Sequence, residues 1–320
     1  MRLRAAWAVV VALMFLSCGK VATVKVPDTP PDAETLAELW VDPGPQPRDL
    51  FWGVGGREHA PSADTVWKLM LRDDAGFSIS FDVKDPQNVE WSAKIGPEAQ
   101  TEVVVSRLLW GLGYHQPPIY YLPSWKLDMG GGKLRTESEA RFRPKLMALD
   151  RKKELWHWAD NRFLGAREFR GLLVILLMFN STDLKDDNNA IYDVHKPWAE
   201  EGKRWYMVRD VGASLGRTGK LFPHRNWLAG FEQQGFIKRV DGRRIEFDYT
   251  GRHQELLSMI RPEDVQWAAE RLQTLTDQQW HDAFRAGNYA DSDTERFLRR
   301  IRQKIDSGLA LRPDAPVAER

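Results

Sequence analysis

The feature that most constrains this chain is a polar loop, Asp183 to Asn188, which reads DLKDDN and directly follows an apolar segment. That segment, 166–179, is apolar on most helical faces, so we expect a buried helix ending at the loop. Residues 190–194 and 204–208 are rich in β-branched and aromatic side chains, which predicts two short strands. Asp210 begins an Asp-Val-Gly triplet just after the second strand. The predicted order is therefore buried helix, polar loop, hairpin and lone aspartate.

Taken alone, the loop has a simpler interpretation. Asp and Asn side chains bond to their own backbone and gather in turns, so such a stretch also serves merely to join a helix to a strand. The order of the neighbouring elements favours a functional loop.

A second pattern lies upstream. Residues 77–83 alternate apolar and polar side chains and 89–94 follow after a turn, which predicts a half-buried hairpin with Lys94 at the end of its second strand. An amphipathic helix is expected over 99–112, opened by a proline and closed by a glycine. We predict that Glu102 pairs with Lys94, with Glu98 as the alternative. The simpler alternative is that Lys94 is an ordinary surface lysine.

As an ordered set, these residues resemble the kinase-like superfamily, and in particular its atypical HipA-type serine kinases. They are similar, more loosely, to the CotH spore-coat kinases and to secretory-pathway casein kinases. The resemblance covers roughly 67–305, and its motifs are specific as a set rather than singly. It implies an α+β, two-lobed fold with a small strand-rich lobe and a mainly helical lobe.

The resemblance also implies a role for each site residue. Asp183 would accept the proton of a phosphoacceptor and Lys185 would lie near the γ-phosphate of ATP. Asn188 and Asp210 would supply the oxygen ligands that Mg²⁺ prefers. Lys94 and Glu102 would hold the nucleotide. The implied function is Mg-ATP-dependent phosphotransfer to an acceptor that the residues do not identify.

The sequence departs from the protein-kinase pattern in several places. Ser181 and Thr182 stand where most kinases have His-Arg, and Val211 replaces the usual Phe. No Ala-Pro-Glu follows and no full glycine-rich loop is found, although the turn 73–76 is short enough to cover phosphates. These departures leave the acceptor and the nucleotide's pose open.

The amino terminus predicts export and anchorage. Two arginines precede an apolar core, 5–16, which is followed by Ser17 and Cys18. This resembles a bacterial lipoprotein signal, 1–17, with lipidation of Cys18 and passage to the periplasmic face of the outer membrane. The alternative is an uncleaved membrane anchor. Cys18 is the only cysteine, so no disulfide within the chain is expected.

Composition places the remaining boundaries. Prolines concentrate between 26 and 48, which predicts an extended tether over 18–49. We expect the strand-rich lobe over 50–135 and the helical lobe over 136–320, with the glycine run 130–132 in the connection between them. The net charge of +1 gives no support for a nucleic-acid partner.

Two other functional classes remain open. Gly212 to Gly216 matches the nucleophile elbow of serine hydrolases, with Ser214 as nucleophile, although no helix is expected to follow it. The chain would otherwise be a catalytically inactive, kinase-like nucleotide-binding or scaffold lipoprotein. The joint presence of Lys94, Asp183, Asn188 and Asp210 favours an active enzyme.

Overall fold

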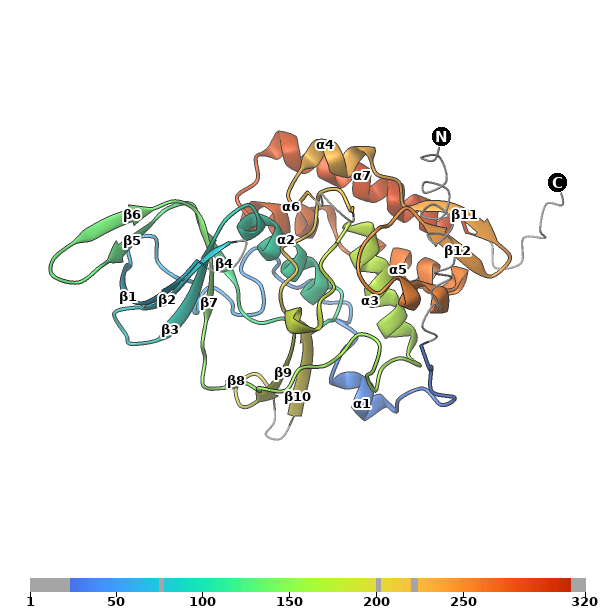
Figure 1. The fold of residues 1–320 in the computed structure, drawn as a ribbon, viewed down its shortest axis with the longest axis horizontal. Helices are drawn as coiled ribbons and strands as arrows, with labels where there is room; N and C mark the ends of the chain where they lie inside the picture. Colours follow the sequence, from blue (N-terminus) through green and yellow to red (C-terminus); the bar gives the residue numbers. More distant parts are fainter. Residues whose placement is uncertain (1–23, 75–77, 200–202, 220–223, 312–320) are drawn as a thin grey trace, which may run out of the picture.

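The computed structural model describes residues 24–74, 78–199, 203–219 and 224–311. A strand-rich lobe and a mainly helical lobe lie side by side (Figure 1). The predicted α+β, two-lobed architecture is confirmed.

The strand-rich lobe is one seven-stranded sheet in the order β4-β7-β3-β2-β1-β5-β6, with β1 and β5 parallel and the other pairs antiparallel. Side chains alternate between the two faces of each strand, and one face carries the aromatic core of the lobe. The other face of β3 and β7 presents polar side chains toward the helical lobe. The strands are β1 (Val66–Asp73), β2 (Ile79–Lys84), β3 (Glu90–Ile95), β4 (Tyr120–Leu122), β5 (Trp125–Asp128), β6 (Leu134–Glu137) and β7 (Ala140–Pro144).

The sheet continues beyond residue 135, where we had placed the boundary between the lobes, because β7 pairs with both β3 and β4. The glycine run does not connect the lobes either. Gly130, Gly131 and Gly132 have φ values of 82°, 62° and 75° and form the turn between β5 and β6. The sequence shows that a turn is needed here, but only strand pairing shows that both flanking segments belong to one sheet.

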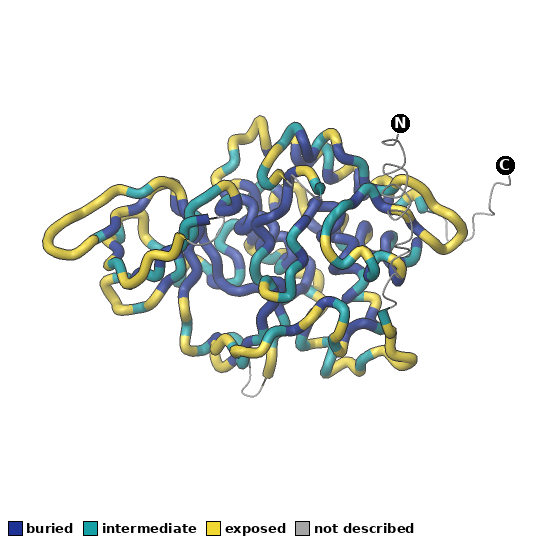
Figure 2. The backbone as a smooth tube through the Cα atoms, in the orientation of Figure 1, coloured by how far each residue is buried: buried dark blue, intermediate teal, exposed yellow. Residues whose placement is uncertain are grey.

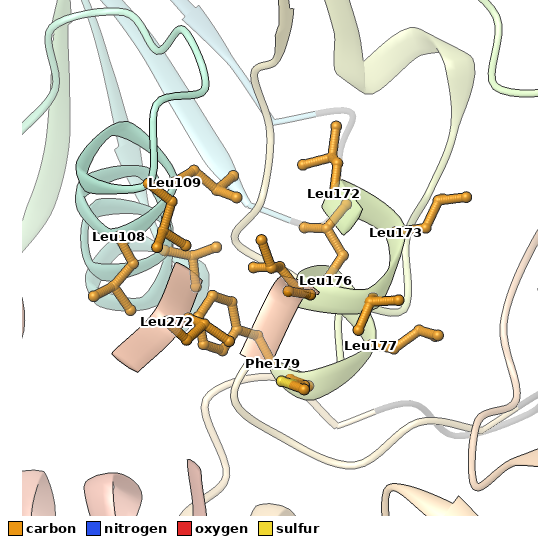
Figure 3. Packing of buried hydrophobic residues seen from close by; sticks show 14 of the residues in the cluster. Leu108, Leu109, Leu172, Leu173, Leu176, Leu177, Phe179 and Leu272 are labelled. Atoms are coloured by element: carbon orange, nitrogen blue, oxygen red, sulfur yellow. The ribbon is translucent and has the colours of Figure 1, made fainter. Parts of the chain in front are cut away.

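The helical lobe is built around α3, which is buried on nearly every face. Figure 3 shows side chains of α2, α3 and α5 meeting in this core, and Figure 2 shows the buried backbone concentrated there. The helices are α2 (Glu98–Gly111), α3 (Arg167–Met178), α4 (Leu228–Gln233), α5 (Pro262–Gln273), α6 (Asp277–Ala286) and α7 (Asp291–Leu309), with 3-10 turns η1 (Asp186–Asn188) and η2 (Gln254–Met259). No helix in the described ranges is both long and apolar enough to cross a membrane.

Two small sheets complete this lobe. One has the order β10-β9-β8 and contains the predicted hairpin, and the other pairs β11 with β12. Their bounds are β8 (Leu149–Arg151), β9 (Asn189–Val194), β10 (Lys203–Val208), β11 (Ile237–Asp241) and β12 (Arg244–Phe247). The predicted order of buried helix, polar loop, hairpin and aspartate is confirmed.

The proline-rich segment differs from the tether that we predicted. It contains α1 (Ala33–Ala37), and the side chain of Leu39 is buried in the main core. Trp40 bridges to Tyr114 and its indole nitrogen donates to the carbonyl of Leu112. Proline content predicts extended backbone, whereas buried Leu39 and partly buried Trp40 hold this segment against α2 and β10.

Candidate functional site

Lys94 lies at the point where the two lobes meet. It is near the end of β3, and its Nζ lies 2.7 Å from Glu98 Oε2 and 3.0 Å from Asp210 Oδ2. Glu102 Oε2 is further away, at 3.8 Å. The ammonium group therefore joins a strand of one lobe to a helix and to the aspartate that follows β10. Lys94 is not an ordinary surface lysine, because only 12% of its side chain is exposed.

Helix α2 presents both glutamates to this point. Glu98 and Glu102 are four residues apart, so they lie on the same helical face. The chain after Asp210 packs tightly on that face, because a Cβ added at Gly212 would lie 2.7 Å from the Cβ of Glu98 and 3.4 Å from that of Glu102. A glycine at this position allows the loop to approach α2 closely enough for Asp210 to reach Lys94.

The nearer partner of Lys94 is Glu98, which we had named as the alternative to Glu102. Glu102 is fully buried and its other carboxylate oxygen lies 3.0 Å from Arg141 Nε and 2.5 Å from Arg143 Nη2. These two arginines draw the Glu102 carboxylate toward β7. Glu98 is also bound by Arg225, at 2.9 Å, and accepts a hydrogen bond from Ser78.

The charges at this point fix the protonation of both partners. Burial by itself would raise the pKa of Asp210, but Lys94 and Arg141 outweigh it and hold that pKa far below its usual range. Burial would likewise lower the pKa of Lys94, but Glu102 and Asp210 outweigh it and raise that pKa. The pair is therefore ionised across the neutral range.

The polar loop brings its predicted residues together. The amide nitrogen of Asn188 donates to the carbonyl of Asp183 at 2.5 Å, so its amide oxygen is the side-chain atom able to bind a cation. The carbonyl of Asn188 accepts the backbone N–H groups of Arg209 and Asp210, at 2.8 and 3.2 Å. Asn188 and Asp210 are thereby held side by side although they are distant in the sequence.

Two oxygen ligands from Asn188 and Asp210 fit a Mg²⁺ ion whose remaining positions are filled by phosphate and water. Among the described residues, no group of three or more His, Cys, Asp or Glu side chains is arranged to hold a metal by itself. A metal bound here would therefore depend on its ligand, as is usual when Mg²⁺ is bound together with phosphates.

Asp183 and Lys185 are also neighbours. Lys185 Nζ lies 2.8 Å from Asp183 Oδ2, and Arg252 Nε lies 3.6 Å from Asp183 Oδ1. Asp186, the residue after Lys185, has a structural role, because it accepts hydrogen bonds from the backbone of Trp158 and from His157. Sequence spacing does not separate these two aspartates, whereas their hydrogen-bond partners do.

The sequence analysis missed the arginines of the site. Arg141 and Arg143 lie opposite Lys94 and Ser92 on the polar face of the sheet. Their alternation with Ala140 and Phe142 in the sequence predicts one polar strand face, but it does not show that this face is buried.

Ser214 is not placed as a nucleophile. It is fully buried, its Oγ donates to the carbonyl of Val211 at 2.8 Å, and no helix follows it directly. A nucleophile elbow requires an exposed hydroxyl between a strand and a helix. The hydrolase interpretation is therefore not supported by the structure.

Comparison with known proteins adds little to this geometry. No protein-family model matches the chain, and no curated protein is significantly similar to it. Among solved structures, the chain is similar to a Golgi casein kinase, with 11% identity and a TM-score of 0.37 over 78% of this chain and 73% of that chain. A similarity at this level does not assign an activity.

Proposed function

We propose that the chain is a Mg-ATP-dependent phosphotransferase with a kinase-like site between its two lobes. The observation that supports this most is the contact of Lys94 with both Glu98 and Asp210, because it joins three predicted site elements at one point. Asn188, held against Asp210 by a backbone hydrogen bond, supplies the second metal ligand.

Each residue would act through its position. Lys94, oriented by Glu98, would donate to phosphate oxygens, and Asn188 and Asp210 would hold Mg²⁺. The metal ion would neutralise charge on the phosphates. Asp183 would orient the acceptor hydroxyl and take its proton, with Lys185 beside it. Positioning and charge neutralisation are the main demands of phosphoryl transfer, and this arrangement serves both.

Melting of residues 24–311 with Mg-ATP tests binding. A ligand that binds only the native state stabilises it by about 2.7 kcal/mol at 100 times its Kd. We expect a higher Tm with Mg-ATP and transfer of label from γ-labelled ATP to a cell-envelope component. An unchanged Tm at saturating Mg-ATP would show that the proposal is wrong.

A nucleotide-binding protein without catalysis is the second candidate. One observation favours it: the two oxygens of the Asp183 carboxylate already contact cations, Lys185 at 2.8 Å and Arg252 at 3.6 Å, where an acceptor hydroxyl would have to bind. Binding of Mg-ATP without transfer to any envelope fraction would identify this alternative.

We also propose that the chain is anchored in the cell envelope by lipid on Cys18. Cys18 lies outside the described residues, so this rests on the apolar core and arginines that precede it. Two acyl chains are enough for stable anchorage. Cys18→Ser should leave an unprocessed precursor without lipid label, and a variant that still matured and fractionated with the outer membrane would contradict the proposal.

A further inference from the structure

A cavity of about 460 Å³ lies beside the Lys94 site, between the end of β7 and the β8–β9 sheet. Four cationic side chains line it: Arg143, Lys145, Arg151 and Arg209. The only acidic side chain in its lining is Asp150. The cavity therefore carries a marked excess of positive charge.

The cations of this cavity differ in how they are neutralised. Lys145 pairs with Asp82 at 3.0 Å and Arg143 with Glu102 at 2.5 Å. Arg209 and Arg151 form no ion pair within the described parts of the chain, and Nε of Arg209 is buried without a hydrogen bond. Two guanidinium groups thus line one cavity without an ion-pair partner of their own among the described residues.

Arg143 is aimed into the same cavity and only 5% of it is exposed. Its Nη2 donates to Glu102 and to the carbonyl of Arg209 at 2.9 Å, but its Nε has no partner. Burial, Arg209 and Arg141 together lower the pKa of Arg143 to about 9. Burial and Arg209 likewise lower the pKa of Arg151. The charged forms of these arginines disfavour one another, and an anion placed between them would remove that cost.

We propose that this cavity binds a phosphate group of a small organic ligand, with Arg143, Arg151 and Arg209 as its donors. Guanidinium groups offer paired N–H donors that match phosphate oxygens, which makes arginine suited to phosphate recognition. Pro117, Pro118 and Leu149 also line the cavity, and their apolar surface can accommodate the organic part of the ligand. An uncharged ring in contact with these arginines would leave them without partners.

The bound phosphate group would belong to one of two ligands, the nucleotide or the second substrate, and its chemistry is the same in both. Neither source requires Mg²⁺, because the donors are arginines, and neither requires Asp210. Phosphate binding in this cavity can therefore be tested independently of the proposed phosphotransfer.

The test measures binding of inorganic pyrophosphate to the folded protein in EDTA, by calorimetry and by melting. We expect a higher Tm and a saturable heat. Arg209→Gln and Arg151→Gln should each weaken pyrophosphate binding at least about 10-fold, as loss of a hydrogen bond to a charged group does. Arg204→Gln is the matched control, because Arg204 lies on β10, is half exposed and pairs with Asp193. It should change binding by less than about 3-fold.

Two further arms complete the experiment. Arg209→Lys keeps the positive charge but loses the paired N–H donors of the guanidinium group, so it should bind pyrophosphate with intermediate affinity. If Arg209→Gln fails to fold, this variant tests whether Arg209 binds the phosphate. Competition between ATP and pyrophosphate in EDTA would assign the phosphate to the nucleotide, and simultaneous binding would assign it to the second substrate. Both outcomes, competition and simultaneous binding, support a phosphate site in this cavity.

Three results would overturn the inference: no pyrophosphate binding, an equal loss in Arg204→Gln, or competition by adenosine together with unaffected binding in both Arg151→Gln and Arg209→Gln. Asp210→Asn separates the two proposals, because it should weaken Mg-ATP binding while pyrophosphate binding in EDTA persists. Mg-ATP binding without pyrophosphate binding would remove only this inference.

Discussion

The contact between the lobes has a lysine end, at Lys94, and an arginine end, at the cavity lined by Arg143, Arg151 and Arg209, and the two ends hold their cations in different ways. At one end Lys94 contacts the carboxylates of Glu98 and Asp210 directly. At the other end Arg151 and Arg209 line a cavity without any ion pair among the described residues. A buried charge without a partner is more costly than a buried ion pair, so arginines that lack an ion pair mark a place where an anion would be stabilising. The Lys94 centre is therefore already assembled by ion pairs, whereas the arginine-lined cavity would be completed by a bound anion.

Glu102 connects these two ends. It is fully buried, and it touches Lys94 on one side and Arg143 on the other. Substitution of Glu98 or Asp210 should therefore affect the lysine end, and substitution of Arg151 or Arg209 should affect the arginine end. Substitution of Glu102 should affect both ends.

The largest expected effect is on transfer at the preassembled end. Asp183→Asn removes the proposed base but none of the metal ligands, so phosphotransfer should fall about 10²–10⁴-fold while Mg-ATP still raises the Tm. Single-turnover transfer of labelled phosphate measures this. Asp187→Asn, in the same loop but exposed, is the matched control and should retain transfer. Equal losses in the two variants would show that the loop, rather than the Asp183 carboxylate, matters.

The next effect tests the connection between the ends. Glu102→Gln leaves Arg141 and Arg143 buried without their shared carboxylate, and breaking a buried ion pair in this way costs about 3–5 kcal/mol. Glu98→Gln should cost less, because Lys94 keeps Asp210 and because an amide still accepts from Ser78. Denaturant unfolding of the two variants measures the difference. If Glu98→Gln is the more destabilising, Glu98 rather than Glu102 is the more important ion-pair partner at the contact between the lobes.

A smaller effect is expected from the contact of the Asp210 loop with α2. Gly212→Ala adds a Cβ at 2.7 Å from that of Glu98, and overpacking of this kind costs about 1–3 kcal/mol. The displaced loop should weaken Mg-ATP binding, whereas pyrophosphate binding at the arginine end should persist. Calorimetric titration with each ligand checks this. Loss of both ligands together would show that the ends are not independent.

The smallest effect is a pH dependence. Because the folded-state pKa of Asp210 is lowered, its stabilising contribution is present above the usual aspartate pKa of about 4 and is lost as pH falls through the folded value. The difference in unfolding free energy between the native chain and Asp210→Asn should therefore be constant from neutral pH down to about 5 and shrink below about 4. A difference that already shrinks between pH 8 and 6 would contradict the ionised Lys94–Asp210 pair.

Part of the site follows from local sequence alone. The spacing within 183–188, the alternation in β2 and the proline before α2 act through neighbouring backbone, so they predicted the elements and their order. They also placed Lys94 at a strand end and Glu98 and Glu102 on one helical face, because periodicity fixes which side chains share a face.

Other features depend on contacts that no local pattern encodes. Lys94 and Asp210 are separated by 116 positions, and only the packing of the two lobes brings them together. The choice of Glu98 over Glu102 depends on Arg141 and Arg143, whose polar strand face reads as exposed until the helical lobe covers it. The proline content of 26–48 predicts a tether, and only the packing of Leu39 on the core shows that this segment belongs to the folded domain. Sequence sets which groups are available and in which local geometry, whereas the packing of distant segments decides which charges are buried, and therefore which of them must be paired.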